Sequence, residues 1–344
     1  MPTSPSLQAI ADAAQMAKST VSYALRDDPK ISIKTRQRIR SLAQKMGYKV
    51  NPLVGVFMTH LRSTRKVPYE ANLAWITAHS TEDGWKKNRS SELFREGVRL
   101  RCEERGYRLE DFWMRQPGMN AKRQKKILEA RGIRGIVVGS LPVSMGHSSI
   151  DLSRLAAITG GYSVSRPNID RVACDAYHAV LNLLRKAYAL GYRRLGLAYS
   201  IGQDRRMEYF ISAALSTYEM NLPRHTQLIA LKFEERRSDL PKVIERWLDR
   251  QSPDFVMGDT PHIAELIRRT GRTLPDDIGF GALNRLPEET HVAGIDQNHA
   301  LAGQTAADFI INKIQANDYG IPQHPRIVLI QGEWREGPTA IKRR

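Results

Sequence analysis

The chain has little cysteine and no long hydrophobic run. Of its 344 residues only Cys102 and Cys174 are cysteines, and they form neither a CxxC pair nor a metal-binding spacing. A disulfide scaffold and a zinc module are therefore excluded, and the reducing cytoplasm is the expected location. No apolar run approaches the roughly 20 residues that span a bilayer, and the first residues do not read as a basic and then apolar leader. We expect no membrane partner, and a secreted binding protein is disfavoured.

Motifs of the common enzyme classes are missing as well. The chain has no GxxxxGK[ST] phosphate loop, no GxGxxG after a strand, no GxSxG elbow and no HExxH pair. Histidines are scattered, and His60, His178 and His299 are interpreted as surface residues or as residues satisfied by neighbours. We predict no catalytic site, no metal site and no cofactor.

Acidic residues are outnumbered by basic ones. The 53 Lys and Arg residues against 36 Asp and Glu residues give a formal net charge of +17. The first 70 residues hold 12 basic and 4 acidic side chains, which leaves +8 on a fifth of the chain. Polyanions are the natural partners of such a segment. Binding to a membrane surface is the competing interpretation, but no basic helix with a lipid-seeking face stands out.

Residues 7–25 have the pattern of two short helices joined by a tight turn. Small residues lie where the helices would cross, and the second helix opens with Lys18, Ser19 and Thr20. This is the layout of a helix-turn-helix, whose second helix enters the DNA major groove. Apolar residues at helical spacing would build its core; they are Leu7, Ile10, Ala11, Ala14, Met16, Val21, Ala24 and Leu25.

A third helix is predicted from about Ile33 to Met46. Ser32 suits its N-cap, and Gly47 suits its end. Its remaining surface carries basic side chains, which favour attraction to phosphates beside a groove-reading helix; they are Lys34, Arg36, Arg38, Arg40 and Lys45.

Four short patterns in fixed order resemble the LacI family of bacterial transcription regulators. They are AIAxxA at 9–14, STVSxxL at 19–25, TRxxI at 35–39 and GYxxN at 47–51. The resemblance implies base contacts from Lys18, Ser19 and Tyr23, of which Lys18 can donate to guanine O6 and N7. It also implies contacts to phosphate oxygens from the hydroxyl-bearing residues Thr20, Ser22 and Thr35.

Three residues depart from the family pattern in this domain. Gln15 stands where the family usually has Gly at the turn, so a positive backbone angle there would cost more. Ala17 replaces the usual Ser that caps the recognition helix, a loss of about 1 kcal/mol of capping energy. Tyr23 stands where the family often carries Arg, so we expect a different operator preference.

Residues 51–58 match the family's hinge helix, which folds against its dimer mate on operator binding. The match implies that Asn51 belongs to the DNA-binding set and that Phe57 takes the place of the Leu that is wedged into the minor groove. An apolar wedge can partly unstack a base step and kink the duplex. A plain linker with buried apolar residues is the alternative.

From about Tyr69 onward, short apolar runs alternate with amphipathic helices, which predicts a parallel α/β sheet. The expected strands are 73–77, 135–139, 156–159, 194–198, 255–258, 278–283 and 327–330, and the expected helices include 94–105 and 176–190. Local patterns such as FxxG at 94–97 and GYRRL at 191–195 resemble the family's effector-binding core. That core has the two-subdomain fold of periplasmic binding proteins.

The expected organisation has three parts. Residues 1–50 form an all-α DNA-binding domain, residues 51–68 a hinge helix and linker, and residues 69–344 a two-subdomain α/β domain for effector binding and dimerisation. The chain is expected to cross between the subdomains near 160–164, 289–294 and 322–326.

Ligands of open α/β sheets bind beyond the carboxyl ends of the strands, which directs attention to the polar residues there. The expected ligand-binding residues are His79, Ser80, Ser140, Arg206, Asp259 and Asn284. Arg206 lies where the family often places an effector-gripping Arg. Asn284 replaces a common Asp, so the ligand need not be an ordinary neutral sugar.

Together these features predict a homodimeric transcription regulator, with repression as the commoner outcome in the family. It would read a palindromic double-stranded operator and respond to a small molecule, such as a sugar or a derivative of one, between its subdomains. Three alternatives remain. A nonspecific DNA-bending protein leaves the core unexplained, a free small-molecule-binding protein leaves residues 7–58 unexplained, and an α/β enzyme accounts for the sheet alone.

Overall fold

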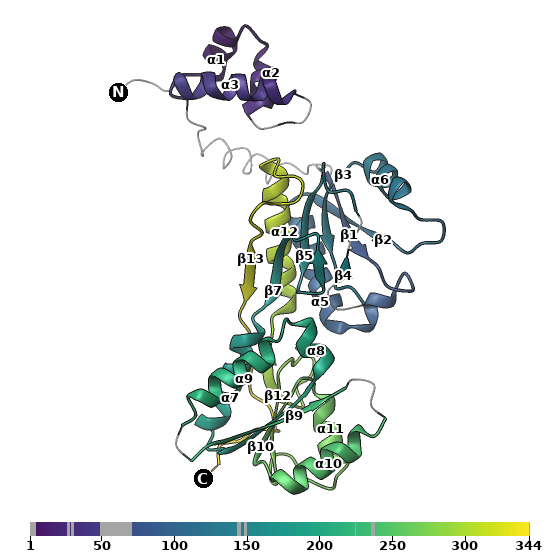
Figure 1. Ribbon diagram of the computed structural model, residues 1–344, viewed down its shortest axis with the longest axis vertical. Helices are drawn as coiled ribbons and strands as arrows, with labels where there is room; N and C mark the ends of the chain where they lie inside the picture. The colour runs from purple at the N-terminus through teal and green to yellow at the C-terminus, as the bar shows by residue number, and fades with distance from the viewer. Residues whose placement is uncertain are drawn as a thin grey trace.

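The computed structural model describes residues 5–25, 28, 31–48, 71–142, 146–147, 150–223, 225–234 and 238–343. A three-helix N-terminal unit is followed by two α/β subdomains stacked end to end (Figure 1). The expected hinge and linker, residues 51–68, lie outside the described residues, and so do Asn51 and Phe57. Among the described residues, no helix is both long and apolar enough to cross a membrane.

The N-terminal unit consists of α1 (Leu7–Ala14), α2 (Lys18–Leu25) and α3 (Ile33–Lys45). The hydroxyl of Ser32 accepts from the Thr35 N–H at 3.3 Å and caps α3, which confirms the predicted cap. Gln15 ends α1 in the left-handed region with φ 54°, so the turn has the conformation that favours glycine. Side chains from the three helices form one small core, and its centre is Ile10, Val21 and Ile39, each 0% exposed.

The first subdomain is built on a six-stranded parallel sheet of order β13-β7-β5-β3-β1-β2. Its strands are β1 (Ala71–Thr77), β2 (Tyr107–Trp113), β3 (Ile133–Val138), β5 (Ala156–Gly160), β7 (Asp170–Cys174) and β13 (Ile327–Ile330). A small side sheet pairs β4 (Gly146–His147) with β6 (Val164–Arg166). Its helical elements are η1 (Gly84–Lys87), α5 (Arg89–Glu104), α6 (Ala121–Ala130) and α12 (His299–Gln315).

The second subdomain has a six-stranded sheet of order β14-β12-β11-β10-β8-β9, in which only β14 is antiparallel. Its strands are β8 (Arg194–Ser200), β9 (Gln227–Phe233), β10 (Phe255–Gly258), β11 (Gly279–Ala282), β12 (Ala293–Asp296) and β14 (Glu333–Arg335). Its helices are α7 (Ala176–Ala189), α8 (Ile201–Arg206), α9 (Phe210–Met220), α10 (Leu240–Gln251) and α11 (His262–Arg268).

Each sheet has an apolar core on both faces, so the predicted class, an all-α unit followed by parallel α/β subdomains, is confirmed. On one face of the first sheet α5 packs against α12. A Cβ on Gly97 would overlap the carbonyl oxygen of Ala300, and a Cβ on Gly303 would overlap that of Phe94. The two glycines therefore allow the helix backbones to touch, which places α12 on the first subdomain.

The chain crosses between the subdomains at 174–176, 296–299 and 330–333, where consecutive elements belong to different sheets. The expected crossings near 160–164, 289–294 and 322–326 were therefore placed too early. The sequence reasoning did not recognise β7, because its first two residues, Asp170 and Arg171, are charged. It also did not assign β13 to the first sheet.

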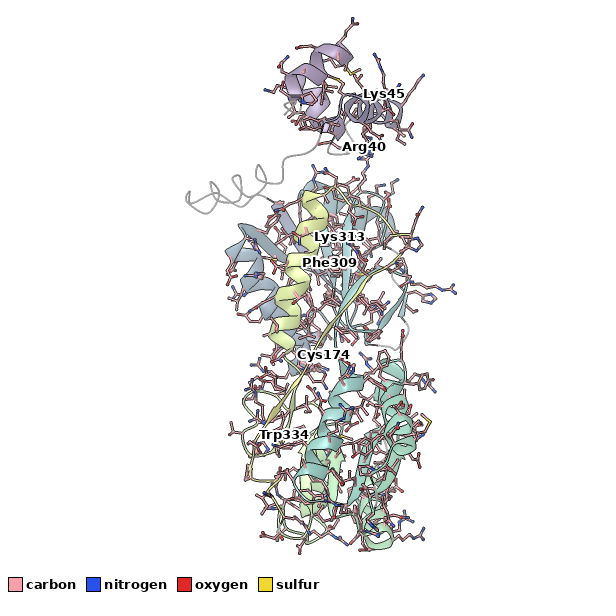
Figure 2. The ribbon with its side chains drawn as sticks, turned by 90° about the vertical axis from the view of Figure 1, so that its left-hand side faces the viewer. Arg40, Lys45, Cys174, Phe309, Lys313 and Trp334 are labelled. Carbon is pink, nitrogen blue, oxygen red and sulfur yellow. The ribbon has the colours of Figure 1, made fainter. Side chains whose placement is uncertain are left out.

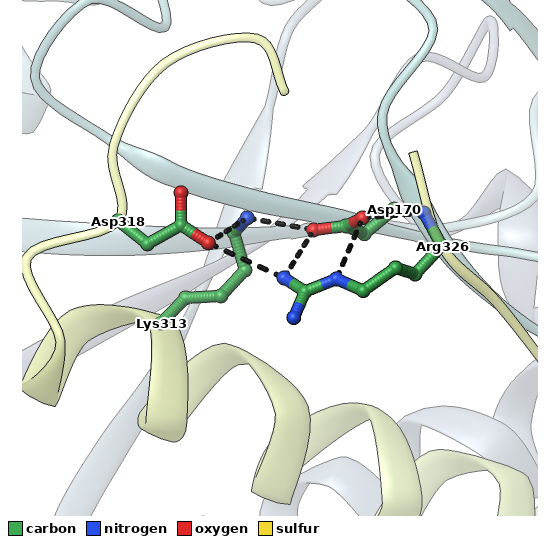
Figure 3. Close-up of polar contacts among 4 residues, drawn as sticks. All are labelled: Asp170, Lys313, Asp318 and Arg326. Carbon is green, nitrogen blue, oxygen red and sulfur yellow. Dashed lines mark hydrogen bonds and ion pairs between the residues drawn. The ribbon is translucent and has the colours of Figure 1, made fainter. Parts of the chain in front are cut away.

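The charge of Asp170 in β7 is accommodated by an ionic cluster in which Asp170 and Lys313 are buried (Figure 3). Asp170 is 0% exposed and accepts from the Lys313 ammonium at 2.6 Å and from the Arg326 guanidinium at 3.1 Å. Asp318 completes the cluster by accepting from the same two cations at 2.9 and 3.2 Å. The cluster therefore joins β7, the last turn of α12 and the start of β13 within one subdomain.

Candidate functional site

The N-terminal unit presents the start of α2 to solvent. Lys18, Ser19 and Tyr23 are exposed, whereas the apolar side of the helix is buried against α1 and α3. Exposed donors at the start of the second helix are the arrangement with which a helix-turn-helix reads base edges. The Ala17 carbonyl accepts from the Val21 N–H at 3.1 Å, but the Ala17 side chain offers the first turn no acceptor.

The residues expected to contact phosphates are more buried than those expected to contact bases. Thr20, Ser22 and Thr35 are half-buried. The Thr35 hydroxyl lies 2.8 Å from the hydroxyl of Ser32, so part of its hydrogen bonding is used in capping α3. A contact to DNA from Thr35 would therefore share the hydroxyl with this cap.

A cleft of about 200 Å³ lies between the subdomains, beyond the carboxyl ends of both sets of strands. This is the edge at which open α/β sheets bind ligands. Four expected residues line it: Ser140 after β3, Arg206 at the end of α8, Asp259 after β10 and Asn284 after β11.

His79 and Ser80 do not line this cleft, in contrast to the expectation. The His79 carbonyl accepts from the Trp113 indole N–H at 2.9 Å, which ties the loop after β1 to the end of β2. The His79 ring Nε2 lies 3.1 Å from the Ser140 carbonyl, so its polar edge is used within the protein. Ser80 is exposed to solvent.

Arg206 bridges the two subdomains. Its Nη2 donates to the hydroxyl of Ser140 at 2.8 Å and to the carbonyl of Leu141 at 3.0 Å, and both acceptors belong to the first subdomain. A ligand that offers an oxygen to the guanidinium would compete with these protein acceptors. Binding of such a ligand would therefore change the hydrogen bonds of Arg206 to the first subdomain.

Asn284 makes a second bridge through a chain of neutral hydrogen bonds, which we call the amide latch. Its Nδ2 donates to the Ser90 hydroxyl at 3.1 Å, and its Oδ1 lies 2.8 Å from Nε2 of His299. The His299 Nδ1 lies 3.4 Å from Sγ of Cys174. Ser90, His299 and Cys174 belong to the first subdomain, so the amide of Asn284 is held by the opposite wall. In Figure 2 Cys174 lies where the two subdomains meet.

Burial keeps the members of the amide latch uncharged. Desolvation lowers the pKa of His299 to about 4, against a weaker opposing effect of Asp296. Desolvation also raises the pKa of the Cys174 thiol to about 12. Because Asn284 Oδ1 can only accept, the neutral imidazole donates from Nε2, and Nδ1 is left to accept from the thiol. Each group of the latch therefore donates a hydrogen bond to the next, in the order thiol, imidazole, amide and hydroxyl.

Asp259 is the carboxylate of the cleft. It is 8% exposed, and its Oδ2 accepts from the Ser200 N–H at 2.8 Å. Ser200 in turn caps α8 by accepting from the Gln203 N–H at 3.1 Å. The carboxylate is therefore fixed at the start of the helix that ends in Arg206.

Aromatic side chains that the sequence reasoning did not single out as ligand contacts form part of the wall. Trp75 and Phe94 line the cleft with ring centroids 6.0 Å apart, and Tyr162 meets Phe210 edge to face at 5.2 Å across the subdomains. The cleft thus combines apolar rings with hydroxyl and amide groups, one guanidinium and one carboxylate. This set suits a small polar molecule with an apolar face. Within the described residues, no three His, Cys, Asp or Glu side chains gather to hold a metal ion.

The comparisons with known proteins agree with both parts of the molecule. Residues 6–51 match the model of the family described as bacterial regulatory proteins, lacI family. The matched segment contains α1, α2 and α3. A search of curated proteins found no match to the chain.

Solved structures extend the likeness to the whole chain. The transcriptional regulator CelR in complex with cellobiose is 15% identical, with 98% of this chain and 100% of that chain covered and a TM-score of 0.55. The lac repressor dimer bound to operator and the anti-inducer ONPF is 14% identical, with 98% and 100% covered and a TM-score of 0.57. A periplasmic binding protein/LacI transcriptional regulator from Alkaliphilus metalliredigens QYMF, complexed with D-xylulofuranose, is 12% identical, with 79% and 100% covered and a TM-score of 0.55. At these identities the likeness establishes a shared fold alone: a helical N-terminal unit is followed by a core of two α/β subdomains.

Proposed function

We propose that the chain is a sequence-specific DNA-binding transcription regulator whose affinity for an operator is set by a small molecule in the cleft. The observation that carries the proposal is the junction of a lacI-family helix-turn-helix with a core whose polar cleft lies between two subdomains. A small-molecule-binding protein without a DNA partner does not account for the helix-turn-helix. A nonspecific DNA-bending protein does not account for the core and its cleft.

For DNA binding, the proposal assigns base contacts to Lys18, Ser19 and Tyr23 and phosphate contacts to Thr20, Ser22 and Thr35. Asn51 and Phe57 belong to the same proposal on sequence grounds alone. Two copies related by a two-fold axis would read a palindromic operator, because one recognition helix per copy contacts one half-site. The role requires the cytoplasm, where bacterial DNA lies, and repression is the outcome we propose.

For effector binding, the proposal assigns contacts to Ser140, Arg206, Asp259 and Asn284. A sugar or sugar derivative fits their hydrogen-bonding capacity, and two of the similar structures carry sugars. A ligand changes DNA affinity only if it binds the two arrangements of the subdomains differently. Exchange of the Arg206 and Asn284 bridges for ligand contacts supplies such a difference. The proposed role is binding and not catalysis.

Site selection followed by ligand screening tests this function. Full-length protein is used to select duplexes from a randomised pool, and binding to the recovered duplex is measured with and without a panel of small sugars and sugar derivatives. We expect one panel member to change DNA affinity, and the recovered DNA to change the affinity for that ligand by the same factor. Recovery of no common sequence, or equal DNA affinity with every ligand that binds the cleft, contradicts the proposal.

A further inference from the structure

Exposed basic residues gather at the edge of the first sheet where its parallel strands begin. We define this basic rim by Arg108 at the start of β2, Lys126 in α6, Arg134 in β3 and Arg154 just before β5. All of them are exposed. The rim belongs to the core, and the sequence analysis assigned no binding role to any of its members.

Among the described residues, none of the four rim residues forms an ion pair with a carboxylate within 4.0 Å, although Asp28, Glu129 and Asp151 line the same cavity as Arg134 and Arg154. In contrast, two neighbouring cations are paired, because Lys125 meets Asp151 at 2.8 Å and Arg131 meets Glu110 at 3.5 Å. The pairing register between β1 and β3 shifts at Arg134, where Asn72 faces Ile133 and the next residue, Leu73, faces Gly135. Such a bulge turns a side chain out of the regular ladder. Arg134 is therefore presented at the edge of the sheet.

The basic rim lies beside the point where the chain enters the core from the DNA-binding domain. Asn72, at the start of β1, donates from its side chain to the Arg131 carbonyl just after α6, at 3.0 Å. Asp28, between α2 and α3, lines the same cavity as Arg134 and Arg154. In Figure 1, α6 and the start of β3 lie at the end of the core nearest to α1, α2 and α3.

The core carries net positive charge of its own, outside the N-terminal segment. The first 70 residues hold 12 of the 53 basic and 4 of the 36 acidic residues, so residues 71–344 hold 41 basic and 32 acidic residues. The core therefore carries +9 of the total charge of +17. Charge of this size that is not paired within the protein attracts phosphates and makes binding depend on salt.

We propose that the basic rim contacts the phosphate backbone of DNA that flanks the operator. This inference rests on the proposed DNA-binding function. From β2 to β5 the rim spans three strand spacings, roughly 14 Å, which is comparable to the axial length of four nucleotides of one strand at 3.4 Å each. Contacts of this kind hold the core against the duplex without reading its sequence, because phosphates are the same at every base pair.

Neutralising the rim tests the inference. The full-length variant Arg108→Gln/Lys126→Gln/Arg134→Gln/Arg154→Gln is compared with Arg185→Gln/Lys242→Gln/Arg246→Gln/Arg250→Gln. The second variant loses the same charge from exposed positions in α7 and α10, in the second subdomain. Binding is measured against salt concentration on two duplexes, one limited to the selected operator and one that carries the operator between long flanks.

We expect the rim variant to show a shallower salt dependence on the flanked duplex. The slope of log K against log salt should fall by about 0.9 for each phosphate contact that is lost. On the short duplex the rim variant should match the wild type, and the control variant should match it on both duplexes.

Two results would overturn the inference. A rim variant whose slope on the flanked duplex equals that of the control shows that its charges are only solvated. An equal loss on both duplexes shows that the rim does not act on flanking DNA. Failure of the proposed sequence-specific DNA binding gives a distinguishable result, because the wild-type protein would then bind selected and scrambled duplexes with equal affinity. The inference would fail together with that function.

Discussion

Two polar networks in this molecule differ in charge, because one is made of ionised groups and the other of neutral groups. At the end of the first subdomain that is nearest to the N-terminal unit, ionised side chains form a cluster of Asp170, Lys313, Asp318 and Arg326. At the cleft, Ser90, Asn284, His299 and Cys174 form the amide latch from neutral groups. The charged cluster joins elements of one subdomain, whereas the latch joins two subdomains.

The energies of the two kinds of contact explain the division. Removing one partner of a buried ion pair costs about 3–5 kcal/mol, because the other charge is left uncompensated. A neutral hydrogen bond contributes only about 0.5–1.5 kcal/mol net, since water or a ligand can replace either partner. Charges therefore suit a joint that stays fixed, and neutral groups suit a contact that must open and close.

The largest expected effect is on the fixed joint. Asp170→Asn should lower the free energy of unfolding by about 3–5 kcal/mol, because Lys313 and Arg326 lose their shared carboxylate. Chemical denaturation of the full chain measures it. The matched control is Asp318→Asn, whose carboxylate is 43% exposed and should matter less. Equal losses in the two variants would show that burial does not set the value of this cluster.

Acid should weaken the latch before it weakens the cluster. Burial lowers the pKa of His299 from 6.5 to about 4, so the unfolded chain binds more protons than the folded chain between these values. Stability is therefore fully present above pH 6.5 and lost as the pH falls towards 4, by up to about 3 kcal/mol. Thermal unfolding across this range measures the effect. His299→Gln keeps a hydrogen-bonding side chain and should flatten the profile between pH 6.5 and 4; an unchanged profile would assign the slope to other groups.

The movable contact should respond mainly in conformation. Asn284→Ala removes two hydrogen bonds and should shift the cleft towards the open arrangement by about 1–3 kcal/mol, with little change in the stability of either subdomain. Distances between spin labels on α6 and α10 measure the opening. Thr305→Ala, on the exposed side of α12, removes a hydroxyl away from the cleft and serves as the control. Labels that stay at the same distance in Asn284→Ala would contradict the latch.

The smallest effect is expected at the rim of the cleft. Arg89 donates to Glu288 across the subdomains at 2.8 Å, but both side chains are 50% exposed. Such a surface pair contributes about 0–1 kcal/mol and is screened by salt. Arg89→Gln should therefore change label distances less than Asn284→Ala does. A larger change would reverse the order of the two contacts.

Several strands with a short, uninterrupted apolar pattern are predictable from the sequence. β5, β10 and β13 were expected within a residue of their observed bounds. The sequence does not predict β7 because Asp170 is charged, and the partners of Asp170 lie more than 140 positions away in the sequence. The sheet-to-sheet crossings were misplaced for the same reason, since they depend on which strands pair and not on local propensity.

The candidate cleft was predictable where a polar residue follows a strand. Ser140, Asp259 and Asn284 follow β3, β10 and β11 and do line the cleft. His79 also follows a strand, yet it does not line the cleft. Trp75 and Phe94 had been placed in a strand and a helix, and nothing in the sequence separates aromatic residues of a core from those of a cleft wall. The role of His299 in the latch requires Cys174 and Asn284, which only the fold brings together.

The central claim is that the first residues distinguish one DNA site from another. It is tested most directly by the affinity of full-length protein for its selected palindromic duplex and for a scrambled duplex of equal length, at physiological ionic strength. We predict a ratio of at least about 10³. In Lys18→Ala, discrimination against the wrong base at one position of the site should fall by about 1–3 kcal/mol. A ratio near one for the wild-type protein would contradict the account.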